Sequence, residues 1–246
     1  QTCALPIFPP NTPVGSDKLK TVVAELAAVR PEFFSVTYGA GGATRDKTLA
    51  TVKDIAAMGH EAAPHLSCVG STADGIREIL ATYREQGIRR LVALRGDLPS
   101  GTAVAGEFRF ASDLIEFIRK EQGSDWHIEV AAYPEYHPQQ RYAKKDLEHF
   151  AHKVKSGASS AITQFFFDND HYFRYLDKVR AKGIEIEIVP GILPVSNYKN
   201  LLKFAGFTNV KIPQWLHQRF EGIADDDQMT RNMVGASVAI DMARVL

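Results

Sequence analysis

Cysteine is scarce in this sequence, and long apolar runs are missing from it. The only cysteines among the 246 residues are Cys3 and Cys68, and two isolated cysteines do not make the disulfide framework of a small secreted protein. No apolar run approaches the roughly 20 residues that span a bilayer, and the N-terminus lacks the basic and apolar regions of a signal peptide. These absences favour a soluble protein of the reducing cytoplasm.

The sequence also lacks an excess of either charge. Lysine and arginine together number 29, as do aspartate and glutamate, and this balance argues against binding to nucleic acid or to an anionic membrane surface. Cys68 has no cysteine or histidine at zinc-ligand spacing, and no GxGxxG motif follows a predicted strand, so neither a metal site nor a Rossmann dinucleotide site is indicated. A site for a small or locally charged ligand remains open.

Apolar residues make up 45% of the chain, enough for a sizeable core. Several helices are indicated by apolar residues that recur with the 3.6-residue period of an amphipathic helix. The residues that define two of them are Leu19, Val22, Val23, Leu26 and Val29 in the first, and Ile76, Ile79, Leu80 and Tyr83 in the third.

Short segments rich in strand-forming residues lie between the helices. The expected strands are 33–37, 62–68, 90–94, 128–133, 161–166 and 184–189, with a seventh if Ile7 and Phe8 end a first strand. Strand–helix alternation with short loops indicates a parallel sheet. We therefore predict an α/β fold, a (β/α)8 barrel that is incomplete because its first strand is truncated and its eighth strand and helix are missing. A doubly wound sheet is the rival architecture.

Polar side chains follow five successive predicted strands at their carboxyl ends, where barrel enzymes place their catalytic groups. Taken singly, each has a structural explanation: Asp97 could cap a loop, His65 could be an interior histidine, and Lys153 reads as part of a solvated helix face. Gln164 is harder to explain in this way, because a buried amide without partners is costly. The convergence of these groups on one rim predicts an active site. The polar strand ends are Thr37–Tyr38, His65, Arg95–Asp97, Tyr133–His137 and Gln164.

The first seven residues have an unusual property. Gln-Thr-Cys-Ala-Leu-Pro-Ile can be back-translated as CAGACGTGTGCTCTTCCGATC, which matches the end of a widely used sequencing-library adapter. Our hypothesis is that residues 1–7 are a non-native, adapter-derived segment, to be excluded from fold reasoning. The alternative is a genuine N-terminal strand that contains an unusual proline. Finding the same seven codons in the genome would end the hypothesis.

Several segments, taken in order, share a specific pattern. They are Ser35–Ala40 (SVTYGA), Ala63–Leu66 (APHL), Ala93–Pro99 (ALRGDLP), Ala132–Glu135 (AYPE), Ala161–Asp168 (AITQFFFD) and Pro190–Val195 (PGILPV). Together they resemble the signature segments of methylenetetrahydrofolate reductases of the bacterial single-domain type. The resemblance runs from about Phe8 to Leu246, and as an ordered set the motifs are highly specific.

The resemblance implies that residues 8–246 are a single FAD-binding (β/α)8-barrel catalytic domain that lacks its C-terminal end. It implies an oxidoreductase of one-carbon and methionine metabolism, in which NADH or NADPH reduces FAD and the flavin reduces methylenetetrahydrofolate to methyltetrahydrofolate. The expected partners are these small molecules, and a homo-oligomer is expected for the full-length protein.

The resemblance also implies roles for individual residues. Asp97 and Gln164 are the expected catalytic residues, and Asp97, Gln164 and Phe204 are expected to meet the folate or the nicotinamide. The expected FAD contacts are Thr37, Tyr38, Ala40, His65, Arg95, Gly96, Asp97, Ala111, Tyr133, His137, Asp146 and Lys153.

One position departs from the family pattern. The family has a glutamate in the first strand that acts as general acid, and Pro6 stands there in this chain. Because proline cannot donate a proton, and because the family's eighth strand and helix carry further contacts, we expect impaired folate reduction and weak FAD binding. Two alternatives remain open: a non-catalytic flavin- or folate-binding barrel, and an unrelated aldolase or lyase barrel that uses Lys153 or His137.

Overall fold

A computed structural model of the chain describes residues 4–38, 43–96, 106–135, 137 and 143–246. The chain divides into two compact units, one made of residues 1–130 and 155–160 and the other of residues 131–154 and 161–246. Each unit is described by itself. Among the described residues, no helix is both long enough and apolar enough to cross a membrane.

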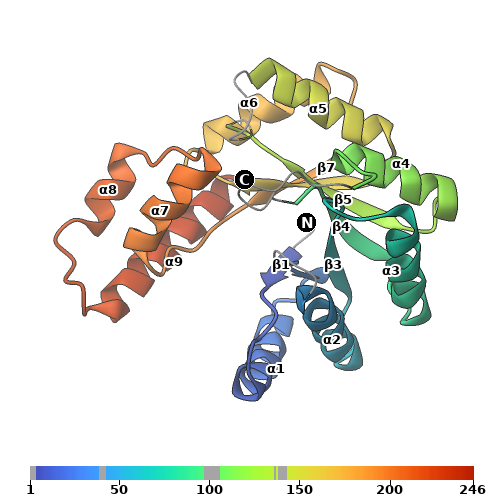
Figure 1. The fold of residues 1–246 in the computed structure, drawn as a ribbon. Helices are drawn as coiled ribbons and strands as arrows, with labels where there is room; N and C mark the ends of the chain where they lie inside the picture. The colour runs from blue at the N-terminus through green and yellow to red at the C-terminus, as the bar shows by residue number, and fades with distance from the viewer. Residues whose placement is uncertain (1–3, 39–42, 97–105, 136, 138–142) are drawn as a thin grey trace. The chain divides into compact units, whose positions relative to one another are not determined.

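Strands and helices alternate along the chain (Figure 1). The first unit contains β1 (Ala4–Ile7), α1 (Pro13–Ala27), β2 (Phe33–Val36), α2 (Ala43–Ala57), β3 (Ala62–Ser67), α3 (Ala73–Glu85), β4 (Arg90–Leu94), α4 (Ala111–Gln122) and most of β5 (His127–Ala132). The second contains most of α5 (Ala143–Lys155) and of β6 (Ser160–Phe165), then α6 (Asn169–Arg180), β7 (Glu187–Gly191), α7 (Tyr198–Thr208), α8 (Gln214–Phe220) and α9 (Gln228–Val245).

The strand order identifies the architecture. The described strands form one seven-stranded sheet in the order β1-β2-β3-β4-β5-β6-β7, and the pairs from β1–β2 to β4–β5 are parallel. A doubly wound sheet would reverse its order at a switch point, whereas a barrel adds each strand beside the previous one. The predicted incomplete (β/α)8 barrel is therefore confirmed over the rival architecture.

The helix boundaries follow from local chemistry. Thr12 and Thr72 cap α1 and α3, since each hydroxyl accepts a hydrogen bond of 3.1 Å from the backbone N–H three residues on. The apolar face predicted for α3 is confirmed, because Ile76 and its three partners are all buried. The face predicted for α1 was partly wrong. Val29 lies beyond the end of that helix and is 67% exposed.

Two prolines occupy strands in different ways. Pro6 lies in β1, in register with Ser35 of β2, and β1 is the first strand of the described sheet, where a missing N–H is tolerated. Pro64 lies in β3, which pairs with β2 through Ala62–Pro64 and with β4 from His65 onward. The pairing partners of β3 therefore change from β2 to β4 at Pro64, which has no backbone N–H to donate. His65 is the first residue of β3 that pairs with β4.

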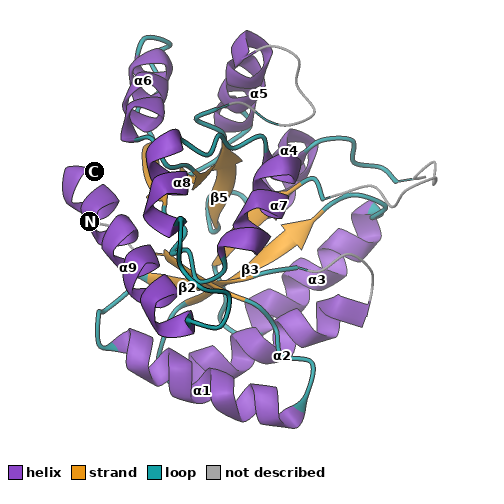
Figure 2. Cartoon of the chain, turned by 90° about the vertical axis from the view of Figure 1, so that its left-hand side faces the viewer, coloured by secondary structure: helices purple, strands orange, loops and turns teal. Residues whose placement is uncertain are grey.

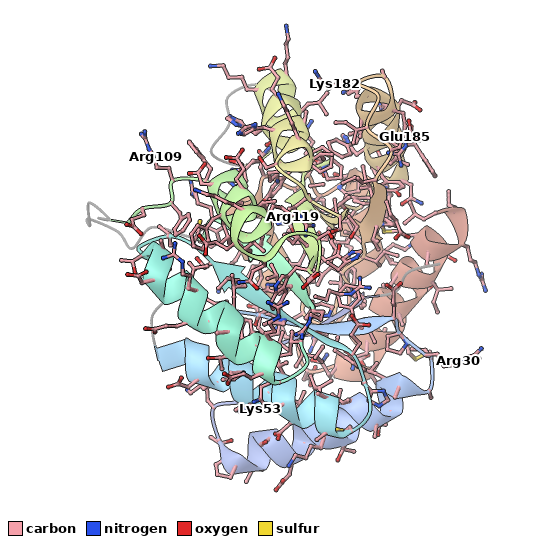
Figure 3. The ribbon with its side chains drawn as sticks, turned by 90° about the vertical axis from the view of Figure 1, so that its right-hand side faces the viewer. Arg30, Lys53, Arg109, Arg119, Lys182 and Glu185 are labelled. Atoms are coloured by element: carbon pink, nitrogen blue, oxygen red, sulfur yellow. The ribbon has the colours of Figure 1, made fainter. Side chains whose placement is uncertain are left out.

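Helices of the first unit pack side by side along the strands. Figures 1 and 2 show α1 and α2 next to one another, and α2 also contacts β2 and β3. Arg119 of α4 (Figure 3) hydrogen-bonds to residues outside its helix. Its guanidinium donates twice to the Gly157 carbonyl, at 2.7 and 2.9 Å. It also donates to the Trp126 carbonyl at 2.7 Å and to Ser159 Oγ at 3.0 Å. A single side chain thus ties α4 to the segments that lead into β5 and β6.

In the second unit, α9 lies against the segment that follows β7. A Cβ atom added at Gly235 of α9 would stand 2.0 Å from the Val195 carbonyl oxygen, and Asn169 Nδ2 donates to the Met242 carbonyl at 3.1 Å. Real atoms do not approach to 2.0 Å, so the helix approaches this closely only because residue 235 has no side chain.

Gly235→Ala is therefore expected to destabilise the protein. Moving α9 off Val195 costs about 1–3 kcal/mol, the range measured for overpacked cores. Gly206→Ala in α7 is the matched control, since nothing lies within 4 Å of the added Cβ, and removing an exposed helical glycine stabilises a helix by up to about 1 kcal/mol. Urea unfolding of both variants measures the difference. Equal stabilisation by the two alanines would contradict the observed packing of α9.

Candidate active site

The chain passes from the end of β4 through a glycine, Gly96, that has no room for a side chain. Gly96 has a φ of +86°, and a Cβ atom there would lie 1.9 Å from Ser67 Oγ. Ser67 Oγ donates to the Arg95 carbonyl at 3.0 Å, and the Val69 N–H donates to the same oxygen at 2.8 Å. The end of β3 therefore fixes the backbone of the Arg-Gly pair, while the Arg95 Nε–H donates to the Gly96 carbonyl at 3.2 Å. Asp97, the next residue, lies outside the described residues.

Residues at the ends of β2 and β3 are also fixed through the backbone. The Thr37 N–H donates to the Ile7 carbonyl at 2.9 Å, and the Thr37 carbonyl accepts from Thr48 Oγ1 at 3.0 Å. Tyr38 is half-buried beside it, and Ala40 lies outside the described residues. His65 is half-buried in β3, and burial lowers the pKa of its imidazole to about 4. His65 is therefore neutral near pH 7 and offers one donor and one acceptor.

The second unit gathers four of the predicted FAD contacts into one cluster. Tyr133 and His137 pack edge to face, with ring centroids 4.6 Å apart. Lys153 Nζ donates to the Ala131 carbonyl and lies 5.9 Å from the Tyr133 ring centroid and 5.7 Å from that of Phe150. The interpretation of Lys153 as part of a solvated helix face is therefore wrong, because the residue is half-buried and its ammonium group contacts the Ala131 carbonyl and two aromatic rings.

The charges of this cluster are only partly balanced. Burial lowers the pKa of Lys153 to about 8, and the nearby Asp146 carboxylate opposes that shift. Burial likewise raises the pKa of Asp146, against the opposing effects of Lys153, the His137 N–H and His149. An enclosed ammonium group with a depressed pKa is stabilised by a further anion, so the cluster is suited to bind a phosphate group.

Two of the residues predicted to meet substrate lie on β6 and α7, and the third, Asp97, lies outside the described residues. Gln164 is half-buried in β6, and its Oε1 accepts from the Phe165 N–H at 3.1 Å. Phe204 lies on α7 and is 60% exposed, so its ring is available for stacking. Ala111 of the first unit is half-buried at the start of α4.

Sequence reasoning missed two residues of these clusters. Phe150 forms part of the enclosure of the Lys153 ammonium, and its buried position on α5 was readable from the helical period. Glu135 has a side chain that is only 7% exposed, and its place two residues after Tyr133 in the AYPE segment was the only available signal.

Comparison with known proteins shows the family of the chain. The family model for methylenetetrahydrofolate reductase matches residues 1–246. The chain belongs to the methylenetetrahydrofolate reductase family. The resemblance predicted from the ordered motifs is thereby confirmed, and membership in this family argues against the alternative of an unrelated aldolase or lyase barrel.

Individual members of the methylenetetrahydrofolate reductase family align over nearly the whole chain. The 5,10-methylenetetrahydrofolate reductase of Pectobacterium carotovorum is 48% identical over 240 residues, which cover 97% of this chain and 79% of that relative. The enzyme of the same name from Escherichia coli K12 is 47% identical with the same coverage. "Methylenetetrahydrofolate reductase (NADH) 1" of Arabidopsis thaliana is 36% identical over 253 residues, 96% of this chain and 42% of that protein.

Solved structures support the fold. An uncharacterised protein from Clostridium thermocellum, described as binding two copies of 5-methyl-5,6,7,8-tetrahydrofolic acid, superposes with a TM-score of 0.65 at 13% identity, covering 99% of this chain and 83% of that one. The deoxyribose phosphate aldolase of Aeropyrum pernix gives a TM-score of 0.52 at 14% identity over 77% of this chain and 76% of that one. At such identities the likeness concerns the fold alone.

Proposed function

We propose that this chain reduces 5,10-methylenetetrahydrofolate to 5-methyltetrahydrofolate, with FAD as its bound cofactor and NADH or NADPH as the reductant. The observation that carries the proposal is the identity of 47–48%, over 97% of the chain, with bacterial enzymes named 5,10-methylenetetrahydrofolate reductase. The homo-oligomer expected for the full-length protein stays a prediction.

The cluster around Lys153 fits the diphosphate of FAD. The ammonium group has the Ala131 carbonyl as its hydrogen-bond acceptor and Asp146 as a nearby opposite charge, so a phosphate oxygen would offset the cost of burying it. Tyr133 and His137 add aromatic surface beside the ammonium group. The motif resemblance assigns further FAD contacts to Thr37, Tyr38, Ala40, His65, Arg95, Gly96, Asp97 and Ala111.

When bound, FAD supplies hydride transfer between the nicotinamide and the folate, and the protein supplies position and charge. In this proposal the Asp97 carboxylate stabilises positive charge on the folate that accepts the hydride; its role rests on the sequence motif. Gln164 both donates and accepts, which suits the mixed edge of a pterin. Phe204 offers a flat apolar face to either substrate in turn.

Flavin binding should weaken as the pH rises above about 8. An anion bound beside Lys153 raises the pKa of that amine, so the complex holds a proton that the free protein loses above its own pKa of about 8. The limiting decrease in FAD affinity is about tenfold per pH unit. Fluorescence titration with FAD between pH 7 and 9 measures it.

Two variants control this pH experiment. Lys153→Met should bind FAD more weakly at pH 7 and should lose the decrease above pH 8, whereas Lys144→Met on the exposed face of the same helix should behave as the wild type. An unchanged profile in Lys153→Met would show that this amine does not contact the cofactor.

The visible absorbance spectrum tests the whole proposal. The chain is mixed with FAD under anaerobic conditions, without desalting because weak binding is expected, and is then given NADH and methylenetetrahydrofolate in turn. The bound flavin should bleach with NADH, and it should regain its colour with the folate once a proton donor is restored at position 6. An FAD absorbance spectrum that the protein does not perturb, at any protein concentration, would overturn the assignment.

Pro6 favours a second candidate, a non-catalytic flavin- or folate-binding barrel. A chain that lacks the family's general acid could retain binding without folate turnover. The same spectrum separates the two candidates: in a binding barrel, the folate perturbs the flavin absorbance but never reoxidises the reduced protein, even after glutamate is introduced at position 6.

A further inference from the structure

Glu135 makes contacts that no assigned role explains. It follows Tyr133 at the end of β5, and its side chain is only 7% exposed. Its Oε2 accepts a hydrogen bond of 3.1 Å from the backbone N–H of Lys211, 76 residues further along the chain. Its own carbonyl accepts a longer bond of 3.5 Å from Asn209 Nδ2. Glu135 thus holds residues 209–211 through both its carboxylate and its backbone.

The segment that Glu135 holds is the connection between α7 and α8. Asn209 ends α7 in the left-handed conformation, with φ 58° and ψ 23°, which breaks the helical hydrogen-bond pattern. Val210 is buried at 6% exposure, and the Lys211 N–H finds its acceptor in Glu135. The connection that follows α7 is therefore held to Glu135 by its carboxylate and its carbonyl.

α7 is also the helix that carries Phe204, five residues before Asn209. The Phe204 ring is 60% exposed, so packing of the ring itself does little to hold it in place. Its position depends on where the helix is held. An anchor at the C-terminal end of α7 restricts how that helix can tilt, and with it where the ring lies.

We propose that Glu135 is a positioning residue, which ties the α7–α8 connection to the end of β5 and so sets the place of Phe204 for the folate or the nicotinamide. The inference rests on the proposed function for its substrates, but the anchoring contact itself does not depend on a cofactor.

The electrostatics around Glu135 make the anchor responsive to pH. Burial raises the pKa of Glu135; the Lys211 N–H, His171 and the Lys211 ammonium oppose the rise, and Asp168 adds to it. His171 Nε2 lies 3.9 Å from Glu135 Oε2 and 3.8 Å from Asp168 Oδ2. Among the described residues, Glu135 Oε1 is buried without a hydrogen-bond partner. Because an ionised acceptor makes the stronger bond, the anchor weakens as the pH falls through the raised pKa of Glu135.

Hydrogen exchange on the protein without cofactor tests the anchor. In Glu135→Ala the amides of residues 209–211 should exchange about tenfold faster, the effect of losing one hydrogen bond to a charged group. Glu135→Gln, which keeps an acceptor without charge, should fall between that variant and the wild type. Lys211→Ala keeps the backbone donor and should raise the exchange rate far less than Glu135→Ala at pH 7. An unchanged rate in Glu135→Ala would overturn the proposal.

A pH series adds a result that general loosening of the fold would not give. After correction for intrinsic chemistry, exchange at 209–211 should accelerate in the wild type as the pH falls from 7 toward the raised pKa of Glu135. It should stay level in Glu135→Gln, because an amide does not titrate. Matching pH profiles for the two proteins would overturn the pH response of the anchor.

Binding of 5-methyltetrahydrofolate to the FAD-loaded protein, followed by flavin absorbance, tests the consequence. Glu135→Ala should lose about tenfold in folate affinity at unchanged FAD affinity, and Glu135→Gln should recover most of it. If exchange rises but folate affinity is unchanged, Glu135 is only structural and the positioning role is wrong. If no protein takes up FAD, the proposed function fails, and the exchange experiment still decides whether Glu135 is the anchor.

Discussion

Arg90→Ala is expected to destabilise the protein by about 3–5 kcal/mol, the cost of leaving a buried charge without its partner. The Arg90 guanidinium binds three carboxylates: Glu129 at 2.8 Å, Glu61 at 2.9 Å and Glu32 at 2.5 Å. The Glu129 side chain is only 1% exposed. Without Arg90, the remaining partners of the Glu129 carboxylate are His127 Nε2 at 3.1 Å and the Ser160 hydroxyl at 2.5 Å. These two groups do not replace the charge of the lost guanidinium.

The pH dependence of this effect has a definite sign. Burial alone would raise the pKa of Glu129, but hydrogen bonds from His127 and Ser160 and the charges of His127 and Arg90 outweigh it, so the pKa is lowered from its usual 4.5. A carboxyl with a lowered pKa stabilises the fold above its unfolded value and loses that contribution as the pH falls through its folded value. The difference between Arg90→Ala and the wild type should therefore shrink below about pH 4.5.

Urea unfolding at pH 7 and at pH 4 measures both effects. Arg77→Ala is the matched control, because Arg77 also pairs with two carboxylates but is 45% exposed, and exposed pairs contribute only about 0–1 kcal/mol. Equal losses in the two variants would show that burial of Glu129 does not set the cost.

Pro6→Glu is expected to raise the rate of folate reduction by about 10² to 10⁴, the contribution of a positioned general acid. Pro6 is exposed in β1 and in register with Ser35, so a longer side chain meets no packed core there. β1 has β2 as its neighbour in the described sheet, and a glutamate backbone fits an edge strand at least as well as proline does.

Pro6→Gln separates proton donation from shape. The amide has the size of glutamate but transfers no proton at neutral pH, so its folate turnover should stay at the wild-type level while NADH oxidation is the same in all three proteins. The measurement is folate-dependent reoxidation of the reduced flavin in a stopped-flow spectrometer. Equal gains from Gln and Glu would contradict the general-acid role of position 6.

Much of the fold was predictable because local patterns encode it. The period that predicted α3 depends on residues three and four apart, and Ile76, Ile79, Leu80 and Tyr83 are all buried as expected. The regular alternation of strand and helix predicted a parallel sheet, because successive parallel units are usually neighbours in space, and the observed strand order decided for the barrel. Val29 was misplaced since periodicity continues past the residue where a helix ends.

The candidate site was predictable only where a motif reports it. The ordered segments identified the family correctly, and the resemblance implied cofactor contacts for residues such as His65, Arg95 and Lys153, which stay predictions. Nothing local to Lys153, however, predicted that its ammonium group is enclosed between Tyr133 and Phe150. On its own helix it looks like an ordinary exposed lysine.

The sequence alone was enough to predict the class of fold and the family. The reason is that helix and strand periods and the individual motifs are each formed by residues near one another in the chain. Contacts between residues far apart in the sequence could be seen only in the folded chain. Examples are Arg90, which pairs with three glutamates that lie in or just before separate strands, and Glu135, which accepts from the Lys211 N–H. Such contacts depend on where parallel strands and their connections bring distant backbone together. Burial then determines the pKa of each charged group and how much it contributes to stability, and the burial of a residue depends on the whole fold and not on any one segment.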